Sequence, residues 1–179
     1  MYLDEKKGFI ILGVLLVIGM LSSLFLIYEH FSPEASKWCT FGESFNCGIV
    51  NKSPYANVDG IFYLMVIDYG WSVPFIYFHD SSPILDFLSG NAFLGFLTLI
   101  LLFILLHLWR QKKGLLFIKP NQVKKYMLGI LVFGVLYGLY LFYIQHSILK
   151  IYCPFCLVLD FVLITSTIVC FFLPDEVKQ

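Results

Sequence analysis

The chain has 179 residues, of which 59% are hydrophobic and 18% aromatic, and its mean hydropathy is +0.83. These values exclude an ordinary water-soluble domain and indicate a membrane protein of one domain. The formal net charge is zero, so charge gives no reason to expect a nucleic-acid partner. About 20 helical residues cross a bilayer's hydrocarbon core. Long apolar runs therefore predict four spans, at residues 9–28, 91–109, 126–147 and 152–173.

Charged residues are distributed unevenly between these spans. The loop 110–125 contains no acid, and its basic residues are Arg110, Lys112, Lys113, Lys119, Lys124 and Lys125. The positive-inside rule places this loop in the cytoplasm, and Lys6 and Lys7 before the first span agree with that. Residues 29–90 carry seven acids and only two lysines. We therefore expect both termini inside, the first span retained as an anchor, and an outer loop and cap at 29–90.

Residues 58–79 are apolar enough to suggest a fifth span. They include Asp59, Asp68 and Pro74, and a carboxylate in mid-membrane is costly unless it is satisfied. Their tyrosines and tryptophan suit the membrane–water interface. We therefore expect residues 57–90 to form a partly helical cap on the outer surface. The predicted fold class is an all-α membrane protein, a four-helix transmembrane bundle with an extracytoplasmic loop and cap.

Four of the five cysteines form two pairs at the outer ends of predicted spans. Cys153 and Cys156 begin the last span as "CPFC", and the positive end of a helix dipole there favours the thiolate of the first cysteine. Pro154 suits the first helical turn. Cys39 and Cys47 close the short loop "CTFGESFNC". Two crossings separate the pairs, so both are expected on the outer face.

Two dithiol pairs on one face can exchange disulfides, because exchange needs only a thiolate and a mobile partner. Electrons would pass from an outside dithiol to Cys39 and Cys47, and then to Cys153 and Cys156. Beside a bilayer, and with no haem, flavin or iron–sulfur signature, the natural two-electron acceptor is a lipid-soluble quinone.

Other readings of the cysteines remain open at this point. The two pairs can be static disulfides that staple the cap, as is common in oxidising compartments. A zinc site built from four thiolates is a further alternative. Cys170, deep in the last span, is expected to be a small buried hydrophobic residue. His146 lies near the outer end of the third span, where it can stabilise a thiolate or simply reach the interface.

The segment "WCTFGESFNCGIVNKSPYA", followed by two spans and then "CPFC", resembles the vitamin K epoxide reductase family. The resemblance covers Cys39 to about Leu173. It implies a four-helix bundle around a quinone. It also implies that the loop cysteines relay electrons between a thioredoxin-like partner and the C-x-x-C pair. Some bacterial relatives carry that partner as a fused domain, whereas here we expect a separate protein.

The resemblance also implies roles for individual residues. Cys39 is similar to the loop cysteine that meets the partner, and Cys47 to the one that exchanges with Cys153. Cys156 is similar to the cysteine that reacts with the quinone. Ser53, six residues after Cys47, matches the family's loop serine.

Two positions concern the quinone itself. Asn91 followed by Gly95 resembles the start of the second span in vertebrate members, whose asparagine hydrogen-bonds the quinone carbonyl. Those members carry a tyrosine four residues after the second C-x-x-C cysteine, where this chain has Asp160. Burial in a span favours the protonated form of Asp160, which can donate a hydrogen bond or a proton to a quinone. The alternative is a hydrogen bond that only packs helices together.

The sequence thus predicts a membrane thiol oxidoreductase that couples disulfide formation in a thioredoxin-like protein to reduction of a quinone. The quinone is expected to be menaquinone, ubiquinone or a vitamin K type. The pattern favours a prokaryotic plasma membrane, with the endoplasmic reticulum as the alternative. The competing functions are reduction of vitamin K epoxide by the same cysteines, and a disulfide-stapled or zinc-binding scaffold without enzymatic activity.

Overall fold

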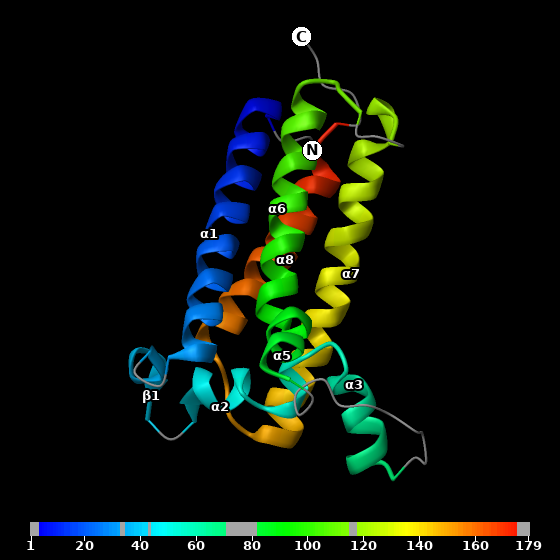
Figure 1. Ribbon diagram of the computed structural model, residues 1–179. Helices are drawn as coiled ribbons and strands as arrows, with labels where there is room; N and C mark the ends of the chain where they lie inside the picture. The colour runs from blue at the N-terminus through cyan, green and yellow to red at the C-terminus, as the bar shows by residue number, and fades with distance from the viewer. Residues whose placement is uncertain (1–3, 33–34, 43, 71–81, 115–117, 175–179) are drawn as a thin grey trace. The chain divides into compact units, whose positions relative to one another are not determined.

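Four long apolar helices dominate the computed structural model, which describes residues 4–32, 35–42, 44–70, 82–114 and 118–174. They are α1 (Glu5–Phe31), α6 (Asn91–Arg110), α7 (Val123–Tyr143) and α8 (Pro154–Phe172) (Figure 1). Each is long and apolar enough to cross a bilayer, with α7 extended at both ends by η4 (Pro120–Gln122) and η5 (Ile144–Leu149). The prediction of an all-helical membrane protein with four spans is confirmed.

The helix ends differ from the predicted span ends by a few residues. α1 runs to Phe31 and so includes Glu29 and His30, which puts a carboxylate near the end of the first helix. A π-helical segment, η5, extends α7 to Leu149, and Lys150 stops it in the left-handed conformation at a φ of 55°. α8 then begins at Pro154, whose missing N–H is no loss in a first turn.

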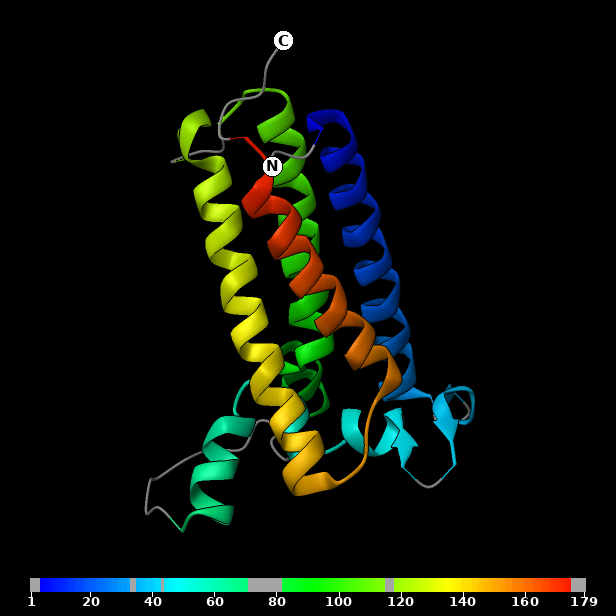
Figure 2. The same ribbon diagram turned by 180° about the vertical axis from the view of Figure 1, so that it is seen from behind.

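Contacts divide the chain into two compact units, each of which draws on all four long helices. Unit 1 comprises Met1–Leu21, Leu97–Tyr140 and Val158–Gln179. Within it the four helices lie side by side around an apolar core (Figure 1, Figure 2). Its most deeply buried side chains are Leu12 and Leu16 from α1, Leu102 and Leu105 from α6, Met127 and Leu131 from α7, and Cys170 from α8. The prediction of a buried, unpaired Cys170 is confirmed.

Two glycines of α7 let α8 approach closely within unit 1. A Cβ built on Gly134 would lie 3.4 Å from the Leu163 side chain, and one built on Gly138 would collide with the Asp160 carboxylate. Gly134 and Gly138 are four residues apart and so share one helix face. Small residues at this spacing are a common contact in membrane helix pairs, where close backbone packing replaces a hydrophobic driving force.

Unit 2 comprises Ser22–Phe96 and Leu141–Leu157, and it contains the described short elements between α1 and α6. In chain order these are η1 (Ala35–Cys39), β1 (Thr40–Phe41), β2 (Phe45–Asn46), α2 (Cys47–Asn51), η2 (Pro54–Ala56), α3 (Gly60–Tyr63), η3 (Leu64–Asp68) and α5 (Pro83–Ser89). None of these described elements is long enough to span a bilayer.

The segment 57–90 is partly helical, as the sequence suggests for a cap. An antiparallel bridge between Asn57 and Gly90 closes its base, and the Val58 N–H donates to the Ser89 carbonyl at 3.0 Å. Residues 71–81, which include part of the stretch considered as a fifth span, lie outside the described residues. The location of this cap on the outer membrane surface stays a prediction.

Candidate redox site

The first cysteine pair is placed by a small β-hairpin. β1 and β2 are antiparallel, with Thr40 opposite Asn46 and Phe41 opposite Phe45. The next residues outward are Cys39 and Cys47, so the register puts them opposite each other. They form a disulfide, with their Cα atoms 5.5 Å apart. The seven residues between the two cysteines therefore fit a short hairpin in which each strand contributes two paired residues.

The second pair is brought to the first by a parallel backbone bridge. Phe45 pairs with Tyr152. The Asn46 N–H donates to the Tyr152 carbonyl, and the Tyr152 N–H donates to the Ser44 carbonyl, each at 2.9 Å. Because the two segments run in the same direction, the residues that follow them emerge together. They are Cys47 and Cys153, whose Sγ atoms lie 3.4 Å apart.

Cys153 and Cys156 form the second disulfide, at the start of α8, with their Cα atoms 5.2 Å apart. The Cys156 N–H donates to the Cys153 Sγ at 3.1 Å, as expected for a sulfur at a helix N-terminus. Phe155, between the two cysteines, stacks on Phe25 of α1 with the ring centroids 4.3 Å apart. This contact fixes the C-x-x-C turn against α1.

A buried glutamine holds the backbone of Cys153. The Gln145 side chain, in η5, is 1% exposed, and its Oε1 accepts a hydrogen bond from the Cys153 N–H at 2.7 Å. Cys153 precedes α8 and would otherwise bury an unpaired N–H. Gln145 therefore sets the position of the sulfur that faces Cys47.

Burial distinguishes Cys156 from the other three sulfurs. The side chains of Cys39, Cys47 and Cys153 are fully buried, whereas Cys156 keeps part of its surface exposed. Of the four sulfurs, only that of Cys156 can be contacted without a movement of the surrounding chain. The two buried sulfurs that touch, Cys47 and Cys153, are shielded from competing thiols.

The far end of α2 is anchored to α1 by a buried polar cluster. The Asn51 Nδ2 donates to the Leu26 carbonyl at 2.7 Å and to the Glu29 carboxylate at 2.9 Å. Glu29 is fully buried, and the Lys52 ammonium lies 4.0 Å from it. α2 begins at Cys47, so this anchor fixes the helix whose first residue carries the sulfur next to Cys153.

His30 joins the same cluster to α5. Its Nδ1 lies 3.0 Å from the Asn51 carbonyl, and its Nε2 lies 2.8 Å from the Asp86 carboxylate. Both partners offer acceptor oxygens, and a ring nitrogen donates to its partner when it carries the proton. Asp86 also accepts from the Asn57 Nδ2 at 2.8 Å. One histidine thus links α1, α2 and the cap segment.

The other predicted site residues in unit 2 have structural contacts of their own. The Ser53 Oγ donates to the Val50 carbonyl at 2.7 Å and closes the end of α2. The Asn91 Nδ2, at the start of α6, donates to the Tyr55 carbonyl at 3.2 Å. His146 is hydrogen-bonded to the Tyr152 hydroxyl at 2.7 Å, and no hydrogen bond between described residues joins it to a cysteine.

Asp160 belongs to unit 1, where its half-buried carboxylate lies against the backbone of α7 at Gly138. Within the described part of the chain its carboxylate has no hydrogen-bonding side chain. In its protonated form this group can therefore donate a hydrogen bond to a ligand. In the same residues, no group of three or more histidine, cysteine or acidic side chains is placed to hold a metal ion.

Sequence reasoning missed Gln145, Glu29 and Asn51. Glu29 offered a signal, since an acid directly after an apolar run needs a partner if the helix continues. Gln145 offered a weaker one, as a polar amide two residues before the predicted span end. Asn51 lies in a loop rich in polar residues, and its contact to a segment 22 positions away has no local signature.

Two disulfides whose sulfurs touch, in a chain with four helices able to span a membrane, are features expected of a membrane redox protein. The model of the vitamin K epoxide reductase family matches residues 10–171, and the chain belongs to this family. Its members are membrane oxidoreductases that use quinones and generally work with thioredoxin-like partners. No match was found among the curated proteins or the solved structures.

Replacing Gln145 with methionine should destabilise the site. The Gln145→Met variant keeps the volume but leaves the buried Cys153 N–H without an acceptor, which costs about 1–3 kcal/mol. Denaturant unfolding in detergent measures the loss, and the rate of disulfide exchange between the two pairs should fall as well. The exposed Gln122 provides the matched control, because Gln122→Met should change neither. Equal values for the two variants would show that Gln145 does not position Cys153.

Removing the Asn51 amide should loosen the anchor of α2. Asn51→Ala takes two hydrogen bonds from a buried carboxylate and a carbonyl, and we expect a loss of about 1–3 kcal/mol in the free energy of unfolding. Asn51→Asp should cost more, since it adds a second carboxyl beside Glu29. The exposed Asn121→Ala is the control, expected within about 0.5 kcal/mol of the native chain. The anchor is refuted if Asn51→Ala unfolds like the control.

Proposed function

We propose that this protein is a membrane thiol oxidoreductase that oxidises a thioredoxin-like partner and passes the electrons to a quinone. The observation that supports this best is the 3.4 Å separation between Cys47 and Cys153, which belong to two different disulfides. Two disulfides with only a structural role do not require their sulfurs to lie so close together. A relay does, because each exchange step joins one sulfur of each pair.

The electrons follow the order of the contacts. A dithiol of the partner reduces the Cys39–Cys47 disulfide and becomes a disulfide itself. The Cys47 thiolate then attacks Cys153, which releases the Cys156 thiolate, and Cys39 resolves the mixed disulfide. The first pair is again oxidised, and the second pair now holds the two electrons and two protons.

The substrate that takes these electrons is a quinone, which becomes a quinol on gaining two electrons and two protons. Cys156 suits the contact with it, as the one sulfur of the four with exposed surface. As Cys156 transfers its electrons, the Cys153–Cys156 disulfide forms again. Asp160, four residues later in α8, and Asn91 are the proposed hydrogen-bond donors to the quinone oxygens.

The partner-binding surface is proposed around Cys39. Trp38 and Phe41 flank it and are 79% and 61% exposed, and aromatic side chains are enriched in protein interfaces. Cys39 itself is fully buried in the oxidised form. A partner thiolate can reach it only after the hairpin of β1 and β2 shifts. Docking on the exposed aromatic residues would supply the energy for that movement.

The direction of the pathway requires the cysteines on the side where disulfides are made. We propose that both termini and the loop 110–125 are cytoplasmic and that both cysteine pairs are on the outer face, most simply of a prokaryotic plasma membrane. Reduction of vitamin K epoxide uses the same thiols and is the second candidate, since the family description carries that activity. Asp160 in place of the expected tyrosine favours a quinone over the epoxide.

Purified protein given a reduced thioredoxin-like protein and a quinone should form quinol and oxidised partner in equal amounts. Cys156→Ala should reduce quinol formation to the rate without protein, because the sulfur that donates to the quinone is gone. Cys170→Ala makes the same change at a cysteine outside the site and should retain the rate. Quinol formation by Cys156→Ala at the native rate would refute the relay, and product from the epoxide alone would establish the second candidate.

Asp160→Asn separates proton donation from packing. Asparagine keeps the size and can still donate a hydrogen bond, but it cannot release a proton. If Asp160 protonates the nascent quinol, kcat should fall about 100-fold or more while the thermal midpoint stays unchanged. Quinol formation followed over a range of quinone concentrations gives kcat and KM. An unchanged kcat would assign Asp160 to helix packing against Gly138.

A further inference from the structure

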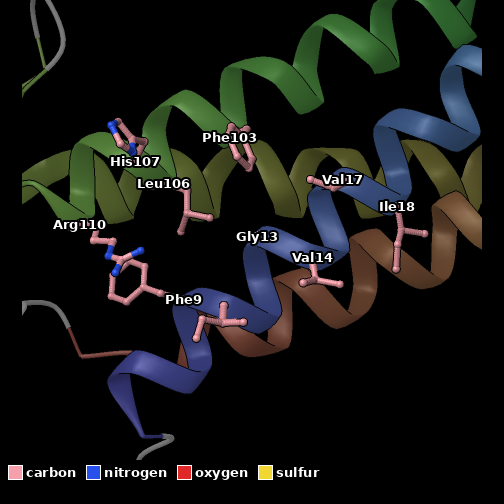
Figure 3. A pocket seen from close by; sticks show the side chains of 10 residues that line it. Phe9, Gly13, Val14, Val17, Ile18, Phe103, Leu106, His107 and Arg110 are labelled. Carbon is pink, nitrogen blue, oxygen red and sulfur yellow. The ribbon is translucent and has the colours of Figure 1, made fainter.

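A groove between α1 and α6 lies wholly within unit 1 and contains none of the redox cysteines. It has a volume of about 380 Å³, which is within the range of small-ligand sites. We propose that it binds an anionic phospholipid, with an acyl chain along the groove and the headgroup phosphate at Arg110. Figure 3 shows the two ends of this groove, with Phe9 and Arg110 at one and Val17 and Ile18 at the other.

The walls of the groove are apolar and uncovered. Ile10 and Val14 of α1 are 62% and 53% exposed, and Phe103 of α6 is 41% exposed. The floor is open because Gly13 has no side chain, and a Cβ there would meet only the Leu106 Cδ2, at 3.8 Å. In a membrane-spanning helix pair such a surface faces acyl chains, and each buried methylene adds to the affinity.

One end of the groove is cationic, and this determines the kind of lipid. Arg110 has no carboxylate partner among the described residues. Lys6 and Lys7 precede Phe9 in α1, and Lys112 and Lys113 follow Arg110, so the groove ends in a basic cluster. Among the described residues at this end of α1 the acids are Asp4, which lies 4.0 Å from Lys7, and Glu5. Basic sites at the cytoplasmic ends of membrane helices bind anionic headgroups.

A second copy of the chain suits this groove less well. Two copies insert into a membrane in the same orientation, so a contact through the groove would bring their basic clusters to the same side. Like charges in close contact repel, whereas a phosphate neutralises the cluster. The charge at this end therefore favours the lipid.

The fluorescence of Trp109 can report which molecule occupies the groove. Trp109 is 3% exposed, and its ring lies 4.8 Å from that of Phe9, which lines the groove. The full chain with Trp38→Phe and Trp71→Phe retains it as the only tryptophan. Fluorescence would be measured in vesicles that contain brominated-chain phosphatidylglycerol or brominated-chain phosphatidylcholine. The anionic lipid should quench Trp109 at lower mole fraction, and added salt should weaken this preference.

Arg110→Gln should lower the preference for phosphatidylglycerol about fivefold, the effect of one cation near an anionic headgroup. Lys125→Gln removes the same charge from α7, outside the groove, and should retain the preference. Gly13→Leu fills the floor and should reduce quenching by both lipids. Circular dichroism verifies that each variant keeps its helices.

Three results would overturn the proposal. Equal quenching by the two lipids would mean that the groove has no headgroup selectivity. Equal losses in Arg110→Gln and Lys125→Gln would assign the preference to the overall surface potential. Quenching by neither lipid, restored when the protein is diluted in the membrane, would show that a second copy fills the groove.

Discussion

Two backbone hydrogen bonds between Tyr152 and the 44–46 segment are the constraint on which the redox site depends. They join parts of the chain more than 100 residues apart, and they place Cys47 beside Cys153 without using either side chain. In the proposed relay this main-chain pairing can survive the exchange of sulfur–sulfur bonds, because none of its backbone atoms takes part in the chemistry. A relay built on side-chain packing alone would lose its alignment whenever a disulfide opened.

Rigid and movable parts of unit 2 follow from where the polar contacts lie. α2 is held at its far end by Asn51, Glu29 and His30, and Cys153 is held by Gln145. The hairpin on the other side of Cys47 is two residues per strand, which gives it few bonds to break. Movement of β1 away from β2 can therefore expose Cys39 while Cys47 and Cys153 remain aligned. β1 is the weakly held strand, whereas β2 stays bonded to Tyr152.

Much of the fold could be predicted from sequence, because hydropathy, length and basic loops act locally. The four spans and the cysteine pairs carry such signals, and a resemblance to known relatives assigned an order to the cysteines. Gln145 and Asn51 could not be found this way. Gln145 bonds to a backbone N–H across the link from η5 to α8, and Asn51 bonds to Glu29, 22 residues away. Gly134 and Gly138 have the spacing of a small-residue packing motif, but this spacing does not indicate which helix packs against them. The partner, α8, follows only from the fold.

The contact between Gly138 and Asp160 shows how packing and chemistry can share one residue. A carboxyl group in a helix seam needs space, and the missing Cβ of Gly138 provides it. A carboxyl group that carries its proton is a hydrogen-bond donor as well as an acceptor. The seam offers it no described side-chain partner, so its donor capacity is unused by the fold. A tyrosine at this position would carry its hydroxyl farther from the helix on a rigid ring. Aspartic acid is shorter, so beside Gly138 its carboxyl group stays close to the helix, and that group can release a proton. The substitution therefore changes the acidity of the group that α8 presents as well as its length.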